Sequence, residues 1–342
     1  MNKKIIYLLI ALVSQVNIVE VSGQNVSLRF RDGKFKIVQF TDIHYNPVSD
    51  KPREVDIEEI ISRVLDAEKP DMVVYTGDIV TGKQDKQGWD KVLKPVIDRK
   101  IPYAVTLGNH DDEYGDWKRP QIAEYLEKQP FSLFQKGAKN IKGAGNFVLK
   151  VLNSNGKAAA VLYCMDSNAY GKVDDKKGWD WFDFNQVEWF RKISLKLTAG
   201  NGGKPYPALA FFHIPLQEYR MLFDTVSINY FERPAKLPVY GERLERECPG
   251  IFNTGMFAAM ALAGDVMGTF VGHDHTNNYI GLLDGIALAY GCNTGVWNTL
   301  KSGGGRVIEL HENQRSFDTW IRLASGEVKQ QVNYPQSFIL NK

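Results

Sequence analysis

Hydrophobic residues along the chain follow two periods, one typical of strands and one typical of helices. Residues 35–40 form a short, mostly apolar run with the character of a buried strand. Residues 57–65 instead place apolar side chains three or four positions apart, which predicts a helix with one buried face. The other predicted strands cover residues 72–75, 103–107, 147–152, 158–165, 208–212, 268–271, 286–290 and 307–310, and the other predicted helices cover residues 89–97 and 185–197.

Strands and helices alternate over residues 35–112, and this order is typical of an α/β layered domain. The later part of the chain is rich in strands joined by glycine turns, which predicts a second sheet stacked on the first. The helix at 185–197 is expected to begin at the N-cap Asn185 and to stop at Gly200. No repeat or linker interrupts the sequence, so residues 24–342 are predicted to form a single domain.

The N-terminus has the pattern of a secretory signal peptide, residues 1–23. Two lysines precede an apolar run at residues 5–13 that is too short to span a bilayer. Cleavage after Gly23 would leave Gln24 first and would export the chain to the periplasm or the extracellular space. A buried N-terminal strand or a retained anchor is the alternative. No later segment is long and apolar enough for a transmembrane helix, so none is expected in the mature chain.

Charge and cysteine content argue against some classes of protein. The formal net charge is +2, which gives no broad attraction for a polyanion, so dedicated nucleic-acid binding is not expected. The cysteines, Cys164, Cys248 and Cys292, lack zinc-finger or C-x-x-C spacing. Cys164 lies in an apolar run and is predicted to be buried. For Cys248 and Cys292, a disulfide in an oxidising compartment and two free thiols are the alternatives. The sequence does not determine the oligomeric state.

Polar motifs rich in histidine and aspartate follow five of the predicted strands. Because ligands of open α/β sheets bind at the carboxyl ends of the strands, these motifs are expected to meet at one site. The chain has 6 histidines, and His311 alone lies outside the motifs. The motifs are Thr41-Asp42-Ile43-His44, Thr76-Gly77-Asp78, Gly108-Asn109-His110-Asp111, the lone His213, and Gly272-His273-Asp274-His275.

Spacing within the motifs favours shared metal ions. Residues i and i+2 of a strand project to the same face, so Asp42 and His44 can point at one ion while Ile43 turns away. His273 and His275 repeat this arrangement. Nitrogen and carboxylate ligands without thiolate suit Fe, Mn, Zn or similar ions. A single histidine at a strand end is more often structural, but structural roles do not explain so many histidines, with aspartates and an asparagine, at strand ends.

On these residues the chain resembles the calcineurin-like metallophosphoesterase superfamily. Its pattern of D-x-H, G-D, G-N-H-D, a single histidine and G-H-x-H is met in full and in order over roughly residues 34–312. The segments 178–181 and 212–215 are most similar to the branch related to purple acid phosphatases. The resemblance implies a four-layer α/β/β/α sandwich and a dinuclear metal centre that hydrolyses phosphoesters.

The resemblance also implies a role for each motif residue. Two divalent or mixed-valence ions of Fe, Mn or Zn would clamp the phosphoryl group and acidify a water, whose hydroxide attacks phosphorus. His110 would protonate the leaving oxygen, and Asp111 would orient His110 or, equally well, cap a turn. One ion would be held by Asp42, His44 and His275, the other by Asn109, His213 and His273, and the Asp78 carboxylate would bridge both.

One position departs from the pattern of true purple acid phosphatases. Those enzymes carry a tyrosine three residues after the bridging aspartate, and its phenolate binds iron and gives the colour. Thr81 stands at that position in this chain. A colourless enzyme is therefore predicted.

The predicted function is hydrolysis of a small phosphorylated substrate, most readily a phosphomonoester, outside the cytoplasm. Phosphodiesterase action on a nucleotide or a lipid head group is an alternative, because the metal core alone does not separate the two reactions. A catalytically silent protein that keeps its metals for binding is a second alternative. The complete ligand set argues against it.

Weaker signals lie near the motifs. The alternatives for Asp166 are support of a metal ligand and formation of a turn, of which the turn is favoured. Lys118 and Arg119 either contact phosphate or are solvated, and solvation is the commoner state of surface lysines and arginines. An aromatic cluster would stack on a nucleobase or phenyl ester, or would pack the following helix on the sheet, which is favoured. Its members are Trp179, Trp181, Phe182 and Phe184.

Overall fold

The computed structural model describes residues 26–49, 56–223, 238–295 and 299–339. Two β-sheets form the centre of the molecule. The predicted signal peptide, residues 1–23, lies outside the described residues. One sheet has 6 strands in the order β15-β14-β13-β1-β2-β3. Its strands are β1 (Lys34–Phe40), β2 (Met72–Thr76), β3 (Tyr103–Thr106), β13 (Gly304–His311), β14 (Phe317–Leu323) and β15 (Val328–Tyr334).

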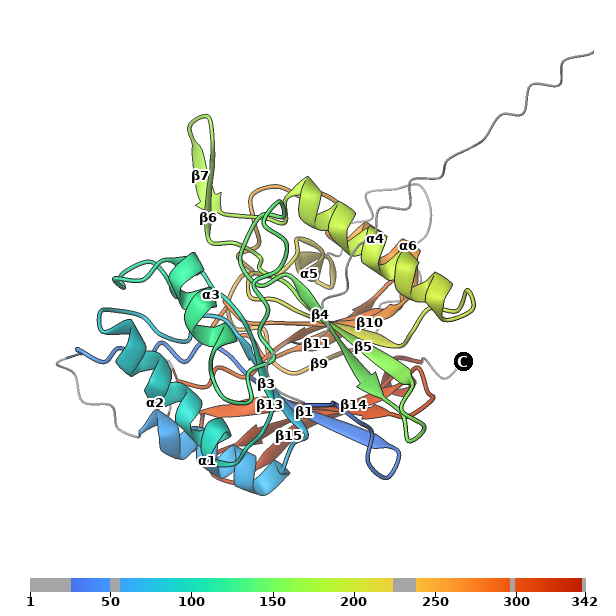
Figure 1. Ribbon diagram of the computed structural model, residues 1–342, viewed down its shortest axis with the longest axis horizontal. Coiled ribbons are helices and arrows are strands. Elements are labelled where there is room, and N and C mark those ends of the chain that lie inside the picture. The colour runs from blue at the N-terminus through green and yellow to red at the C-terminus, as the bar shows by residue number, and fades with distance from the viewer. Residues whose placement is uncertain (1–25, 50–55, 224–237, 296–298, 340–342) are drawn as a thin grey trace, which may run out of the picture.

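The second sheet has 7 strands in the order β4-β5-β8-β10-β12-β11-β9. The strands β5, β8, β10 and β12 run parallel, and antiparallel strands close both sides. The strands of this sheet are β4 (Phe147–Leu152), β5 (Ala158–Cys164), β8 (Ala208–Phe211), β9 (Val239–Tyr240), β10 (Val266–Val271), β11 (Ile280–Leu283) and β12 (Ile286–Tyr290). A separate hairpin, β6 (Tyr170–Val173) and β7 (Lys176–Trp179), projects from the body in Figure 1.

Helices cover the outer face of each sheet, as Figure 1 shows. The helix α1 begins at Asp56, whose side chain accepts a hydrogen bond from the Glu58 N–H at 3.0 Å, and it buries the apolar face predicted from its sequence. With α2 it lies on the first sheet, and α4 and α6 lie on the second. The helices are α1 (Ile57–Glu68), α2 (Asp85–Asp98), α3 (Arg119–Glu127), α4 (Phe184–Gly200), α5 (Glu218–Met221), α6 (Met256–Ala263) and the 3₁₀ turn η1 (Gln336–Phe338).

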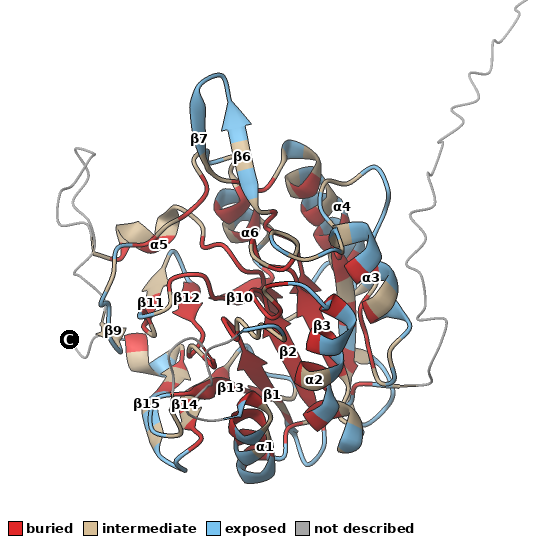
Figure 2. Cartoon of the chain, turned by 90° about the vertical axis from the view of Figure 1, so that its left-hand side faces the viewer, coloured by how far each residue is buried: buried red, intermediate tan, exposed pale blue. Residues whose placement is uncertain are grey.

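Alternation along the second sheet separates two hydrophobic cores. In β5, Leu162 and Cys164 face the core between the sheets, whereas Val161 and Tyr163 face the core beneath α4 and α6. The central strands β2, β10 and β12 are accordingly buried along their whole length in Figure 2, whereas the edge strands β9 and β15 are partly exposed. The predicted four-layer α/β/β/α sandwich is confirmed.

Two details of the predicted organisation are wrong. The predicted strand at residues 307–310 does not join the second sheet: it belongs to β13, which pairs antiparallel with β1 in the first. The helix α4 is capped by Asp183, not by Asn185, because the Asp183 carboxylate accepts the Asn185 N–H at 3.0 Å. Gly200 is the last residue of this helix.

All three cysteines lie in the described residues as free thiols. Cys164 is buried, as predicted, and Cys248 and Cys292 are not bridged in this structure. Over the part of the chain that the structure describes, no helix has the length and hydropathy needed to cross a membrane.

Candidate metal centre

The five motifs meet at one end of the two sheets. The parallel strands β1, β2 and β3 supply motifs from the first sheet, and the parallel strands β8 and β10 supply them from the second. Each motif begins where its strand ends, as expected for a ligand site of an α/β sheet. Asp42 and His44 follow β1, Asp78 follows β2, Asn109 follows β3, His213 follows β8, and His273 and His275 follow β10.

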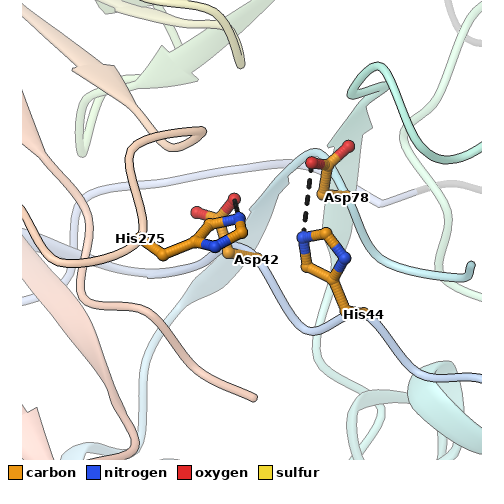
Figure 3. Close-up of side chains that lie close together, drawn as sticks. All are labelled: Asp42, His44, Asp78 and His275. Carbon is orange, nitrogen blue, oxygen red and sulfur yellow. Dashed lines mark ion pairs between the residues drawn. The ribbon is translucent and has the colours of Figure 1, made fainter. Parts of the chain in front are cut away.

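Asp78 lies between two groups of predicted ligands. His44 Nε2 and His213 Nε2 lie 3.4 Å and 3.1 Å from Asp78 Oδ2. On the other side of His44, His275 Nε2 lies 3.7 Å from Asp42 Oδ1, as Figure 3 shows. The donor atoms within each group lie within 4.8 Å of one another, and the groups are Asp42, His44, Asp78 and His275, and Asp78, His213 and His273.

Turns after the strands, and not alternation along a strand, aim these side chains. β1 ends at Phe40, and Asp42 and His44 follow in the left-handed region with φ of 53° and 47°. Asp78 and His273 take φ of 54° and 80°. The expectation that Asp42 and His44 share one face of a strand is therefore wrong in its reason, although the two side chains do meet. For His273 and His275 the same expectation is wrong, because the two histidines belong to different ligand groups. A left-handed backbone at a residue other than glycine costs about 1–3 kcal/mol, and residues in this conformation cluster at functional sites.

Two glycines let the motifs approach one another. A Cβ on Gly108 would lie 2.2 Å from Asp78 Oδ1. A Cβ on Gly272 would lie 1.9 Å from Thr41 Oγ1 and 2.6 Å from Asp42 Oδ2. Because such contacts are far inside van der Waals distance, any larger residue would displace a predicted ligand.

Several buried side-chain atoms that could bind a metal face this centre and have no hydrogen-bond partner among the described residues: Asp78 Oδ2, Asn109 Oδ1, His213 Nε2 and His273 Nε2. His213 Nδ1 donates a hydrogen bond to the Thr76 carbonyl oxygen at 2.7 Å, so Nε2 is the ring nitrogen that would bind a metal once it has lost its proton. Unpaired buried polar atoms cost free energy, and a divalent cation would satisfy them. Imidazole, carboxylate and amide donors without thiolate fit Fe, Mn or Zn.

The same groups shift one another's pKa. Burial would raise the pKa of Asp78, but the imidazoles of His213 and His44 outweigh it and hold that pKa well below its usual range. Burial would lower the pKa of His213, but the Asp78 carboxylate raises it to about 9. Burial and the charge on His213 lower the pKa of His273. In the metal-free chain a proton on His213 thus takes the place of a cation.

His110 is held by a glutamate that the sequence patterns do not single out. Glu113 Oε2 accepts a hydrogen bond from His110 Nδ1, and the His110 backbone N–H donates to Asp78 Oδ1 at 2.8 Å. The His110 ring lies 5.2 Å from the His44 ring, measured between centroids. With Nδ1 engaged by Glu113, Nε2 is the remaining ring nitrogen of His110. An acidic residue three positions after a histidine is too common a pattern to have revealed Glu113.

Asp111 caps the turn after β2. Its carboxylate accepts four backbone hydrogen bonds, and within the described part of the chain it makes no hydrogen bond or ion pair with the His110 side chain. Burial and the charge on Asp78 raise its pKa to about 6. Of the two predicted roles the structure shows the turn cap. The four N–H donors are those of Asp78 at 3.0 Å, Ile79 at 2.7 Å, Val80 at 3.1 Å and Gly108 at 2.7 Å.

Arg119 and Asp166 support the third motif from behind. Arg119 Nη1 lies 3.0 Å from Asp166 Oδ1, and Arg119 Nη2 donates to the Gly108 carbonyl oxygen at 2.7 Å. Asp166 also accepts the Asn168 N–H at 2.8 Å, which is the turn expected from the sequence. Arg119 is therefore neither solvated nor directed at a phosphate.

Of the aromatic cluster, Trp179 alone contacts a predicted ligand in the described structure. Its ring packs edge-on against the His273 ring, with centroids 4.5 Å apart. Phe182 packs on Phe212, as a helix-packing role predicts, and Phe184 is exposed. The preference for a packing role is therefore confirmed for Phe182 and wrong for Trp179 and Phe184.

Fold and motifs agree with a known family. The family model of the calcineurin-like phosphoesterases matches residues 35–277, and the chain belongs to this family. A crystal structure of a dimetal phosphatase from Danio rerio superposes with a TM-score of 0.59 at 12% identity, covering 87% of this chain and 98% of that one. At that identity the likeness shows the fold alone.

Relatives in sequence carry phosphatase names. A protein of Arabidopsis thaliana named probable inactive purple acid phosphatase 29 is 33% identical over 345 residues, covering 88% of this chain and 86% of that protein. Phosphatase DCR2 of Saccharomyces cerevisiae is also 33% identical, and the match covers 85% of this chain and 54% of the yeast protein. Purple acid phosphatase-like proteins are thus among the relatives of this chain.

Proposed function

We propose that this protein is a dinuclear metal-dependent hydrolase of small phosphomonoesters. The observation that carries the proposal is the placement of Asp78, which belongs to both ligand groups. A carboxylate shared in this way is the arrangement that holds two ions close enough to act on one phosphoryl group. The complete set of donors, including the buried Asn109 Oδ1, supports it.

The ligands divide between the two ions as the groups do. Asp42, His44 and His275 would hold one ion, and Asn109, His213 and His273 the other, with Asp78 between them. When bound, the ions supply Lewis-acid stabilisation of the phosphoryl oxygens and lower the pKa of a bound water. Fe, Mn and Zn all suit these donors.

His110 would act on the leaving group. Glu113 accepts the hydrogen bond from Nδ1 and so fixes the ring with Nε2 free to carry a proton to the leaving oxygen. Asp111 and Arg119 take no part in the chemistry: they hold the backbone at Gly108, next to Asn109 and His110.

The test is hydrolysis of a panel of esters by protein stripped of metal and reloaded with Mn, Zn or Fe. We expect metal to restore activity, p-nitrophenyl phosphate to be preferred to its bis ester, and Asp78→Ala to abolish both activity and binding of the second ion. His110→Ala should keep two bound ions and lose about 10²–10⁴-fold in turnover. A clear preference for the diester would indicate the alternative function, a phosphodiesterase.

A second candidate is a metal-retaining protein without catalysis. The observation that favours it is the name of relatives such as the Arabidopsis thaliana protein, which is called probable inactive. Two bound ions with no turnover of any ester, under any metal, would establish this candidate and exclude the hydrolase.

Two further properties belong to the proposal. Thr81 supplies no phenolate, so the loaded protein should lack a strong visible charge-transfer band. The sequence of residues 1–23 supports export, and mass measurement of the mature protein, with Gln24 expected first, would test it.

A further inference from the structure

Three aromatic side chains stand around the residues proposed to bind metal and to protonate the leaving group. The Trp179 ring lies 4.5 Å from the His273 ring, and the Tyr170 ring lies 5.2 Å from Trp179. The Tyr114 ring is stacked on His110, with centroids 6.2 Å apart and planes inclined by 15°. The three rings come from two separate segments of the chain, the loop after β3 and the hairpin β6–β7.

Two of these rings are open to solvent. Tyr114 is 61% exposed and Tyr170 is 48% exposed. Single exposed aromatic residues are ordinary, but a group of them beside a reactive centre marks a surface for binding.

The site itself holds the rings in place. The Tyr170 hydroxyl accepts a hydrogen bond from Asn109 Nδ2 at 3.2 Å. Tyr170 and Trp179 are opposite each other in the hairpin register. An isolated two-stranded hairpin has little stability of its own, and Figure 1 shows this one projecting from the body. The contacts at its base therefore position both aromatic rings against predicted metal ligands.

The order of the rings indicates where a leaving group would lie. The His110 ring has two ring neighbours, His44 at 5.2 Å and the exposed Tyr114 at 6.2 Å, so Tyr114 adjoins His110 where the site opens to solvent. Glu113 contacts His110 and raises the pKa of Tyr114 through a hydrogen bond to its hydroxyl. Tyr170 also hydrogen-bonds with Glu113, so the organic group of an ester whose oxygen reached His110 would have the exposed rings of Tyr114 and Tyr170 beside it.

We propose that Tyr114, Tyr170 and Trp179 form a stacking subsite for the leaving group of the substrate, which is a planar aromatic ring. The inference rests on the proposed hydrolysis of phosphomonoesters and names its substrate class. Aromatic faces bind flat rings through dispersion and offset stacking, and they discriminate poorly between one flat ring and another. The ring is either the aryl group of an aryl phosphate or the base of a nucleoside monophosphate.

The test compares adenosine 5′-monophosphate with ribose 5-phosphate, which share the phosphate and the primary alkoxide leaving group and differ in the base. We expect kcat/KM of the metal-loaded protein to favour the nucleotide about tenfold, the effect of one stacked ring. Tyr114→Leu and Tyr170→Leu should each reduce this preference, and Tyr170→Phe should retain it because the ring is kept. Phe184→Leu, the same kind of change at an exposed aromatic outside the subsite, is the matched control.

Phenyl phosphate separates the two sources of the ring. The substrate is an aryl phosphate if two results are found together. The leucine variants lose more kcat/KM with phenyl phosphate than with ribose 5-phosphate, and the wild type does not prefer the nucleotide to ribose 5-phosphate. If the nucleotide preference is lost, the substrate is a nucleotide. Equal effects of the leucine variants on all three esters would overturn the subsite while leaving the hydrolase intact.

Equilibrium binding makes the inference independent of turnover. Calorimetry on the metal-loaded His110→Ala variant, in which turnover is slowed, should show tighter binding of the nucleotide or of phenyl phosphate than of ribose 5-phosphate, with the difference reduced when Tyr114→Leu is added. If two ions are bound and nothing turns over, the proposed function fails, and this binding difference still decides the subsite. Equal affinities for all three ligands would overturn it.

Discussion

At the scale of single residues, the pair His110 and Glu113 shows how a side chain outside the motifs sets the chemistry of one inside them. The Glu113 carboxylate accepts the hydrogen bond from His110 Nδ1. This fixes the tautomer and the orientation of the ring, as second-layer carboxylates do for catalytic and metal-binding histidines. In the proposed mechanism Glu113 is therefore a positioning residue for the proton that His110 would carry.

Glu113→Ala should release the His110 ring and impair protonation of the leaving oxygen. Esters with a poor leaving group need that proton most, so we expect about a 10–100-fold loss of kcat with an alkyl phosphate. The loss with p-nitrophenyl phosphate, whose leaving group is stable as an anion, should be much smaller. Steady-state kinetics on the two esters measures the difference.

Glu124→Ala is the matched control, because Glu124 pairs with Lys128 on the surface of α3 and should affect neither ester. Equal losses with both esters in Glu113→Ala would show that Glu113 supports the structure of the loop and does not position the proton donor.

At the scale of secondary-structure elements, the turn after β2 depends on one carboxylate. Asp111 accepts the N–H groups of Asp78, Ile79 and Val80, and that of Gly108, all buried or nearly so. Through this cap the loop after β3 holds the loop after β2 in the left-handed conformation that aims Asp78.

Asp111→Ala should destabilise the protein by about 3 kcal/mol, because buried N–H donors would lose a charged acceptor and gain none. Urea denaturation of the metal-free protein measures this change. Asp116→Ala, in the same loop but at an exposed position, should change stability by less than about 0.5 kcal/mol. Comparable stability of Asp111→Ala and wild type would contradict the role of the cap.

At the scale of the whole molecule, the metal centre joins the two sheets. Asp42, His44 and Asp78 follow strands of the first sheet, whereas His213 and His273 follow strands of the second. Bound ions would therefore cross-link the halves of the sandwich, and chelation should lower the thermal stability of the entire domain.

Metal at about 100 times its dissociation constant should stabilise the fold by about 2.7 kcal/mol, and this increment should depend on pH. In the metal-free chain the pKa of His213 is about 9, which is above its value in the unfolded chain. The proton on His213 therefore stabilises the metal-free fold fully below about pH 6.5, and this stabilisation is lost as the pH rises through 9. A metal ion must displace that proton. The stabilisation by metal should therefore grow from pH 6.5 to 9.

Thermal melts with and without chelator at pH 6.5 and pH 9 provide the measurement, and calorimetry in buffers of different ionisation enthalpy counts the released proton. The coupling between His213 and Asp78 would be contradicted if metal stabilised the protein equally at pH 6.5 and pH 9 and its binding released no proton.

The sequence by itself determined the layered α/β class, the places where strands end, and the identity of the residues that gather there. These properties are local: the apolar run of β1 and the periodic face of α1 can be read from a few consecutive residues. The motifs at the ends of β1, β2, β3, β8 and β10 could be expected to meet, since carboxyl ends of parallel strands share an edge. The family resemblance extended that reading to a dinuclear centre.

The tertiary structure decided which elements pair and how the side chains are aimed. The strand β13 could not be assigned to the first sheet from its own residues, because pairing with β1 joins segments more than 250 residues apart. The left-handed turns at Asp42 and His44, whose N–H groups bond to the loop after β2, and the contact of Tyr170 with Asn109 likewise arise when distant loops pack together. Local patterns fix propensity and residue type, whereas pairing and orientation depend on contacts that form only in the assembled fold.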